Sequence, residues 1–195
     1  NVIKGKKNYD ILIVSCWRGN INSSAARVGE TMRAMRKIDE WLCRYLQKNE
    51  LNVAILLRSE RGGKDWYMSA VGATEEEYYL NIYGRDLVDI IDTSSETNHV
   101  FSLIQKSELV FSLLSTAVIE ACGKERKALF INGFANDEFY QSIPRQLVIK
   151  LSSFESFELR INELIKCSAK EFVKKNGDII KKIMEFPDNR STESV

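Results

Sequence analysis

Six short apolar runs recur along the chain, and they constrain its fold more than any other feature. Each run is mostly apolar rather than alternating regularly with polar residues, which is typical of strands buried on both faces of a parallel sheet. Segments with helical periodicity or helix-start signals separate the runs, so strands and helices alternate. The pattern predicts an α/β fold: a doubly wound, mainly parallel, six-stranded Rossmann-like sheet with helices on both faces. The strands are expected at residues 9–15, 52–58, 87–92, 109–114, 127–132 and 146–151.

The intervening helices are marked by apolar spacing and by capping residues. In a capping box, Ser or Thr is followed three residues later by Glu, and each side chain bonds a backbone N–H of the other. No repeat or low-complexity segment interrupts the order of elements, so we expect one domain over residues 1–187 and a disordered tail over 188–195. The expected helices cover 25–48, Thr74 to Gly84, 96–106 and 117–123 (closed by Gly123), and follow capping boxes at Ser152 and Ser168, the last stopping at Pro187.

Composition excludes several classes of protein. The 195 residues carry 28 Lys and Arg against 27 Asp and Glu, and a net charge of +1 argues against a nucleic-acid binder, which usually has a clear basic excess. The four cysteines are far apart and His99 has no Cys or His at metal-ligand spacing, so we expect reduced thiols, no metal and no cofactor. No apolar run approaches the ~20 residues of a membrane span and no signal-peptide pattern opens the chain. We therefore expect a cytoplasmic protein.

Candidate binding residues follow three of the predicted strands. In an open parallel sheet, ligands bind at the carboxyl ends of the strands, near the point where the strand order reverses. The loop after the fourth strand is the most informative, because the strand turns directly into a helix through Ser115 and Thr116. A helix N-terminus suits a diphosphate, and Glu120, one turn further on, could accept both hydroxyls of a ribose. The alternative is that Ser115 only caps the helix and Glu120 is a solvated surface residue.

Residues 107–131 resemble a stretch of the GT-B glycosyltransferases. The pattern of that stretch is S-T-x-x-x-E-A-x-x-x-G-K. Here the Ser-Thr turn is Ser115-Thr116 and the Glu-Ala pair is Glu120-Ala121, with Gly123-Lys124 following, so the match is partial. The stretch is similar to bacterial surface-polysaccharide transferases, teichoic-acid polymerases and UDP-N-acetylglucosamine 2-epimerases. In those families the Ser-Thr turn holds the nucleotide diphosphate and the glutamate holds the ribose. The resemblance implies the same roles for Ser115, Thr116 and Glu120.

Two other loops carry weaker parts of the same resemblance. Arg18 and Gly19 resemble the basic, glycine-containing loop that meets phosphate in this superfamily. Several of these families place a basic residue followed by a histidine after the second strand; Arg58 fits the basic position, but Glu60 stands where the imidazole is expected. This departure weakens the epimerase and teichoic-acid interpretations, and Arg58 can equally be a surface arginine.

The sequence favours a glycosyltransferase domain that binds a nucleoside diphosphate sugar, in surface polysaccharide or glycoconjugate synthesis. No GxGxxG follows the first strand and no GxxxxGK[ST] occurs, which argues against nicotinamide Rossmann and P-loop sites. The catalytic residues are unknown, because we find no convincing general base. Two alternatives stay open: a nucleotide-sensing or docking module without catalysis, and half of a sugar-nucleotide epimerase.

Two expectations concern partners. A GT-B active site lies between two α/β domains; the six strands suffice for one of them, and the chain opens at Asn1 rather than Met. We therefore expect an acceptor-binding domain upstream or on another chain, and an isolated chain that binds the sugar nucleotide without transferring the sugar. Four lysines near Gly177 could touch the anionic inner face of a membrane, although such a face is more often simply solvated. These lysines are Lys174, Lys175, Lys181 and Lys182.

Overall fold

The computed structural model describes residues 8–17, 26–58, 74–92, 99–134, 140, 143–150 and 152–184. Within these ranges six strands alternate with helices in the predicted order. The strands are β1 (Tyr9–Val14), β2 (Val53–Leu56), β3 (Asp89–Ile91), β4 (Ser107–Ser112), β5 (Lys127–Asn132) and β6 (Val148–Lys150). The helices are α1 (Ala26–Leu46), α2 (Glu75–Tyr83), α3 (His99–Gln105), α4 (Ala117–Gly123), the 3₁₀ turn η3 (Arg145–Leu147), α5 (Phe154–Lys166) and α6 (Ala169–Met184).

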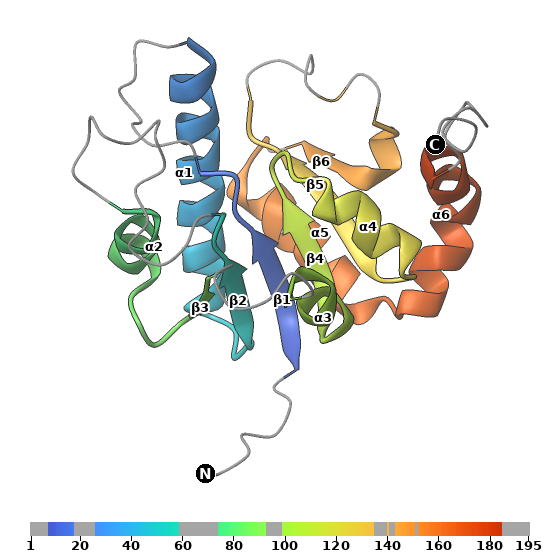
Figure 1. Cartoon of the computed structure of the whole chain (residues 1–195), viewed down its shortest axis with the longest axis horizontal. Helices are drawn as coiled ribbons and strands as arrows, with labels where there is room; N and C mark the ends of the chain where they lie inside the picture. The colour runs from blue at the N-terminus through green and yellow to red at the C-terminus, as the bar shows by residue number, and fades with distance from the viewer. Residues whose placement is uncertain are drawn as a thin grey trace, which may run out of the picture.

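All six strands form one parallel sheet in the order β3-β2-β1-β4-β5-β6 (Figure 1). Ile11 of β1 is in register with Val53 on one side and with Leu109 on the other. The strand order reverses between β1 and β4, which makes their carboxyl ends the switch point of the sheet. The predicted doubly wound α/β class and all six predicted strands are confirmed.

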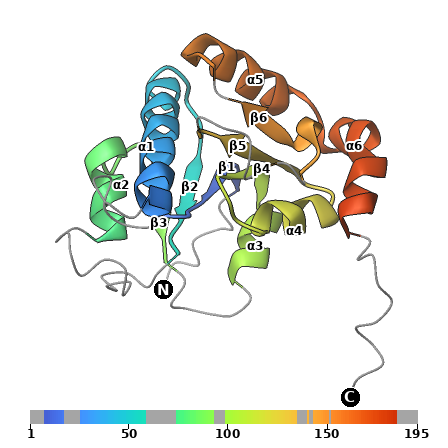
Figure 2. The ribbon, with the colours of Figure 1, turned by 90° about the horizontal axis from the view of Figure 1, so that it is seen from above.

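Helices cover both faces of the sheet (Figure 2). Helices α1, α2 and α5 lie on one face, and α3, α4 and α6 lie on the other. Aromatic rings join α1 to α5: the ring centroids of Trp41 and Phe157 are 6.0 Å apart, and Tyr45 Oη donates to Asn162 Oδ1 at 2.7 Å. The buried strand side chains between the two layers form one continuous core.

Two of the three predicted capping boxes are confirmed. Thr74 Oγ1 accepts from the N–H of Glu77, and the Glu77 carboxylate accepts from the N–H of Thr74. Ser168 and Glu171 exchange the same pair of bonds before α6. The box predicted at Ser152 is wrong, because α5 begins one residue later: the Oγ of Ser153 accepts from the N–H of residue 156 at 3.2 Å.

The predicted closure of α4 by Gly123 is also wrong. Gly123 is the last residue of the helix, and the left-handed position is taken by Glu125, whose φ is 57°. Arg126 N donates to Ala121 O and Glu125 N donates to Cys122 O, both at 3.0 Å, which is the bond pattern of a Schellman turn. At the far end of the chain, α6 runs through Gly177 to Met184, while Pro187 and the predicted tail 188–195 lie outside the described residues.

A buried lysine ties the sheet to α5. Lys127 Nζ donates to Leu164 O at 2.9 Å and to Cys167 O at 2.8 Å, so an ammonium group satisfies the last carbonyls of that helix. Burial lowers the pKa of Lys127 from its ordinary value.

All four cysteines are free thiols, two of them buried. Within the described ranges, no three His, Cys, Asp or Glu side chains are grouped so that they could hold a metal ion. No helix in the same ranges is both long and apolar enough to cross a membrane.

Candidate functional site

Hydrogen bonds to one serine join the two strands of the switch point to the start of α4. Ser112, the last residue of β4, donates from its Oγ to the carbonyl of Val14 at the end of β1, over 2.6 Å. The same Oγ accepts from the N–H of Ser115 at 3.3 Å. The end of β1, the end of β4 and the turn into α4 are therefore held together where the fold places ligands.

Ser115 caps α4 and keeps one hydrogen-bond donor. Its Oγ accepts from the N–H of Ala117 at 3.2 Å, so the capping role considered from the sequence is present. The hydroxyl proton of Ser115 is not used by that bond. Thr116 already has helical torsions, is exposed, and makes no side-chain capping bond. Within the described part of the chain, neither its N–H nor its hydroxyl has a partner, so the turn presents three donors: the Ser115 hydroxyl, the Thr116 hydroxyl and the Thr116 N–H.

Glu120 lies one helical turn after Thr116, because its N–H donates to the Thr116 carbonyl at 3.1 Å. The side chain is half-buried. Among the residues that the structure describes, its carboxylate makes no hydrogen bond and no ion pair. A partly desolvated carboxylate without a protein partner, next to three donors, can accept the hydroxyls of a ligand.

The other candidate residues are less closely joined to this turn. Arg58 follows β2, which is separated from β4 by β1, and its side chain is exposed. Its backbone N–H donates to both carboxylate oxygens of Glu75, at 3.1 and 3.0 Å. Arg18 and Gly19 lie outside the described residues. The structure thus brings Ser115, Thr116 and Glu120 together on one helix and leaves Arg58 two strands away.

A buried polar cluster behind the switch point is absent from the sequence-based prediction. Ser15, just after β1, donates to the Glu75 carboxylate and accepts from Tyr79 Oη at 2.7 Å. Glu75 is only 2% exposed. Together with the bond from Arg58, these contacts fasten the ends of β1 and β2 to the start of α2. The sequence signal is the spacing of Glu75, Tyr79 and Tyr83 every four residues, which puts all three on one buried face of α2.

A second carboxylate, Asp39 of α1, lies beside this cluster. Tyr78 Oη and Tyr83 Oη each donate to it at 2.8 Å. Burial raises the pKa of the Asp39 carboxyl to about 7, although the two tyrosine hydrogen bonds oppose the shift. The neighbouring charges act more weakly, with Glu40 raising this pKa and Arg36 lowering it. Asp39 is therefore a group that titrates near neutral pH inside the fold.

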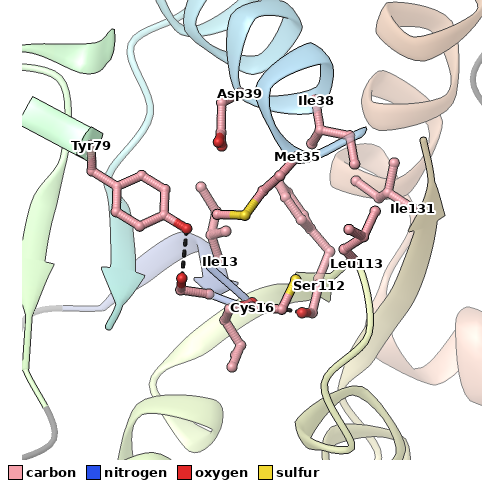
Figure 3. A pocket seen from close by; sticks show the side chains of 12 residues that line it. Ile13, Cys16, Met35, Ile38, Asp39, Tyr79, Ser112, Leu113 and Ile131 are labelled. Atoms are coloured by element: carbon pink, nitrogen blue, oxygen red, sulfur yellow. Dashed lines mark hydrogen bonds between the residues drawn. The ribbon is translucent and has the colours of Figure 1, made fainter. Parts of the chain in front are cut away.

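A small cavity lies between α1 and the sheet, near the switch point (Figure 3). Its volume is about 20 Å³, enough for one water molecule and far below the roughly 300–1,000 Å³ of typical ligand pockets. A nucleotide cannot enter it, so a ligand at the switch point would lie outside, against the start of α4. Residues around the cavity include Ile13, Cys16, Met35, Asp39, Tyr79 and Ser112.

The sequence matches no protein-family model and no curated protein. Solved structures do resemble the chain. A protein from Listeria monocytogenes designated a UDP-N-acetylglucosamine 2-epimerase aligns with a TM-score of 0.52 and 16% identity, over 86% of this chain and 39% of that one. The N-terminal domain of trehalose-6-phosphate phosphatase from Candida albicans aligns with a TM-score of 0.53 and 15% identity, over 92% of this chain and 39% of that one.

What these proteins share with the chain is the fold. A glycosyltransferase from Rickettsia africae ESF-5 also aligns, with a TM-score of 0.49 and 13% identity over 92% of this chain and 49% of that one. The chain spans 39% of the length of the first two structures. The resemblance drawn from the sequence, to one α/β domain of GT-B proteins, thus agrees with the structural likeness at the level of the fold.

Proposed function

We propose that this chain is the sugar-nucleotide-binding domain of a GT-B glycosyltransferase. The observation that carries the proposal is the turn from β4 into α4: it lies at the switch point, presents three unused donors and is followed one turn later by the unpartnered carboxylate of Glu120. In this proposal the sugar nucleotide binds with its diphosphate at Ser115 and Thr116 and with its ribose hydroxyls on Glu120. Following the resemblance, it needs no metal and no cofactor.

The turn suits a departing diphosphate on electrostatic grounds. The Thr116 N–H and the two hydroxyls are donors on two consecutive residues, and the first turn of a helix adds its own partial positive charge. Negative charge grows on the diphosphate as the bond to the sugar breaks. Donors that are already oriented therefore stabilise the transition state more than the bound substrate.

Other groups would complete the reaction. A general base and the acceptor would come from a second α/β domain, upstream or on another chain. Arg18 and Arg58 are further candidates for phosphate contacts. The proposal also includes a peripheral membrane contact through Lys174, Lys175, Lys181 and Lys182 of α6, all of which are exposed. A second candidate function is half of a sugar-nucleotide epimerase, because one structure of the same fold carries that designation.

Calorimetry with UDP-, CDP- and GDP-sugars tests the site. We expect one class to bind, and Glu120→Ala to weaken its binding roughly tenfold to a hundredfold, because hydrogen bonds to a charged group are worth about 1.5–3 kcal/mol. Glu108→Ala is the matched control, since Glu108 is an exposed glutamate at the amino end of β4, the strand that leads into α4. Equal affinities for the wild type and Glu120→Ala would refute the assigned role.

The chemistry is tested on the full-length protein. A transferase releases free nucleoside diphosphate when an acceptor is added, whereas an epimerase isomerises the sugar nucleotide without an acceptor. If no nucleotide binds, the proposal is wrong and the docking-module alternative stays open.

A further inference from the structure

A second pocket lies at the opposite edge of the sheet. It has a volume of about 440 Å³ and lies at the amino ends of β4 and β5, because α3 leads into β4 and Arg126 immediately precedes β5. We call it the amino-edge pocket. Its lining residues are Ser102, Gln105, Lys106, Lys124 and Arg126.

The lining of the amino-edge pocket is rich in positive charge. Three of its five lining residues are cations, and no carboxylate from the described residues lines it. Lys106, Lys124 and Arg126 make no ion pair and no side-chain hydrogen bond within the described part of the chain. The chain as a whole is nearly balanced, with 28 basic against 27 acidic residues, so this cluster is not a consequence of a basic composition.

Helix ends do not cancel the charge. The helices α3 and α4 both end at the pocket, and the C-terminal end of a helix carries roughly half a negative charge at most. Two such ends offset about one of the three cationic charges. Two exposed carboxylates, Glu108 and Glu125, neighbour the lining residues in sequence but do not line the pocket. The lining itself therefore presents positive charge to an anion.

The backbone brings the three cations together. Lys106 and Lys124 occupy equivalent positions, each the first residue after its helix, with their N–H groups bonded to carbonyls of the last turn. The left-handed Glu125 then reverses the chain so that Arg126 N reaches Ala121 O. This turn folds Arg126 back against the end of α4, so that it lines the same pocket as Lys124. A straight extension of the chain would carry Arg126 away from the helix.

The chemistry of the lining identifies the class of ligand. Among the described residues no apolar or aromatic side chain lines the pocket, so it offers no ring on which a nucleobase could stack. Arginine binds phosphate through paired N–H groups and lysine adds point charges. Ser102 and Gln105 supply neutral donors. We propose that the amino-edge pocket binds a compact phosphate-bearing anion, such as a diphosphate or a phosphorylated sugar.

This pocket is distinct from the site at Ser115 and Thr116. The seven residues of α4 separate the two, which corresponds to a helix length of about 10 Å. The inference does not depend on the proposed function, and each can fail alone.

An NMR titration of the ¹⁵N-labelled chain with inorganic diphosphate tests the proposal. We expect saturable shifts at the amides of residues 102–106 and 124–126. Lys124→Gln and Lys106→Gln should each weaken binding about tenfold, because each removes one charged hydrogen-bond donor. Lys166→Gln is the matched control: Lys166 is an exposed lysine at the end of α5, outside the pocket, and its loss should leave binding unchanged. Two variants on separate helix ends keep the test decisive if one of them does not fold.

Vesicle binding distinguishes the source of the phosphate. Binding to phosphatidylglycerol vesicles but not to soluble diphosphate, lost in Lys124→Gln and kept in Lys166→Gln, would assign the phosphate to a lipid headgroup. Absence of binding in both assays would overturn the proposal. Binding that all three variants retain, or amide shifts confined to residues 115–117, would overturn it as well.

Discussion

Replacing Asp39 by Asn should remove a pH-dependent loss of stability from the fold. Burial raises the pKa of this carboxyl from its ordinary value of 3.8 to about 7. A shift of roughly three units corresponds to about 4 kcal/mol. At low pH the carboxyl is neutral in both the folded and the unfolded chain. As the pH rises from about 4 to about 7, the unfolded chain releases its proton first, so the free energy of unfolding falls.

Between pH 5 and pH 8 this effect amounts to roughly 2–3 kcal/mol of the total. The amide that replaces the carboxyl would be neutral at every pH, and it can still bond both tyrosine hydroxyls, because each hydroxyl can accept as well as donate. Urea unfolding of the wild type and Asp39→Asn at the two pH values measures the difference. We expect the variant to gain roughly 2–3 kcal/mol on the wild type at the higher pH. Asp86→Asn controls for the loss of one exposed carboxylate. A stability difference that is the same at both pH values would show that Asp39 is ionised in the fold at pH 5.

Two further substitutions test the packing that supports the site. Gly133→Ala should lower the free energy of unfolding by about 1–3 kcal/mol, because the new Cβ would lie 2.8 Å from the backbone oxygen of Ala34 in α1. Gly177→Ala is its control in urea unfolding and should stabilise by roughly 0.5–1 kcal/mol, since its Cβ would meet nothing within 4 Å and it lies inside a helix. Lys127→Met should cost about 1–3 kcal/mol, because it strips the donor from the last carbonyls of α5. In thermal unfolding, Lys166→Met, an exposed position on the same helix, should change little, and equal losses in the two variants would contradict the capping role of Lys127.

The fold could be predicted because its signals are local. A strand buried on both faces shows as consecutive apolar residues, as in β5, where the four residues from Ala128 to Ile131 are apolar and buried. The boxes at Thr74 and Ser168 need residues only three positions apart. The sequence places the start of α5 one residue early because Ser152 and Ser153 are both suitable caps, and only the path of the chain decides between them. The prediction for Gly123 fails for a similar reason: the left-handed residue of the turn falls on Glu125.

The candidate site is accessible to the same reasoning only in part. Ser115, Thr116 and Glu120 lie where a strand-turn-helix pattern puts them, and their roles remain a proposal. Sequence reasoning misses the buried carboxylates, because a charged side chain in a sequence is expected at the surface. Glu75 is buried through a bond to Ser15, 60 positions earlier, and that partnership exists only after the sheet has formed. The amino-edge pocket likewise depends on two helices ending side by side.

The central place of β1 has a consequence for how the chain folds. Val14 and Ser112 are bonded across 98 positions of sequence, and β1 cannot be covered on that side until β4 arrives. Closing so long a loop is costly in chain entropy and slow, whereas β1 and β2 can pair earlier around α1. During synthesis β1 would therefore remain unpaired on the side of β4 until β4 is made. A partly formed sheet with an unpaired apolar strand is the kind of intermediate that aggregates or binds chaperones. When β4 adds to β1, the edge is closed and the turn into α4 is assembled in the same step, so a chain stalled before that point has neither a finished core nor a binding turn.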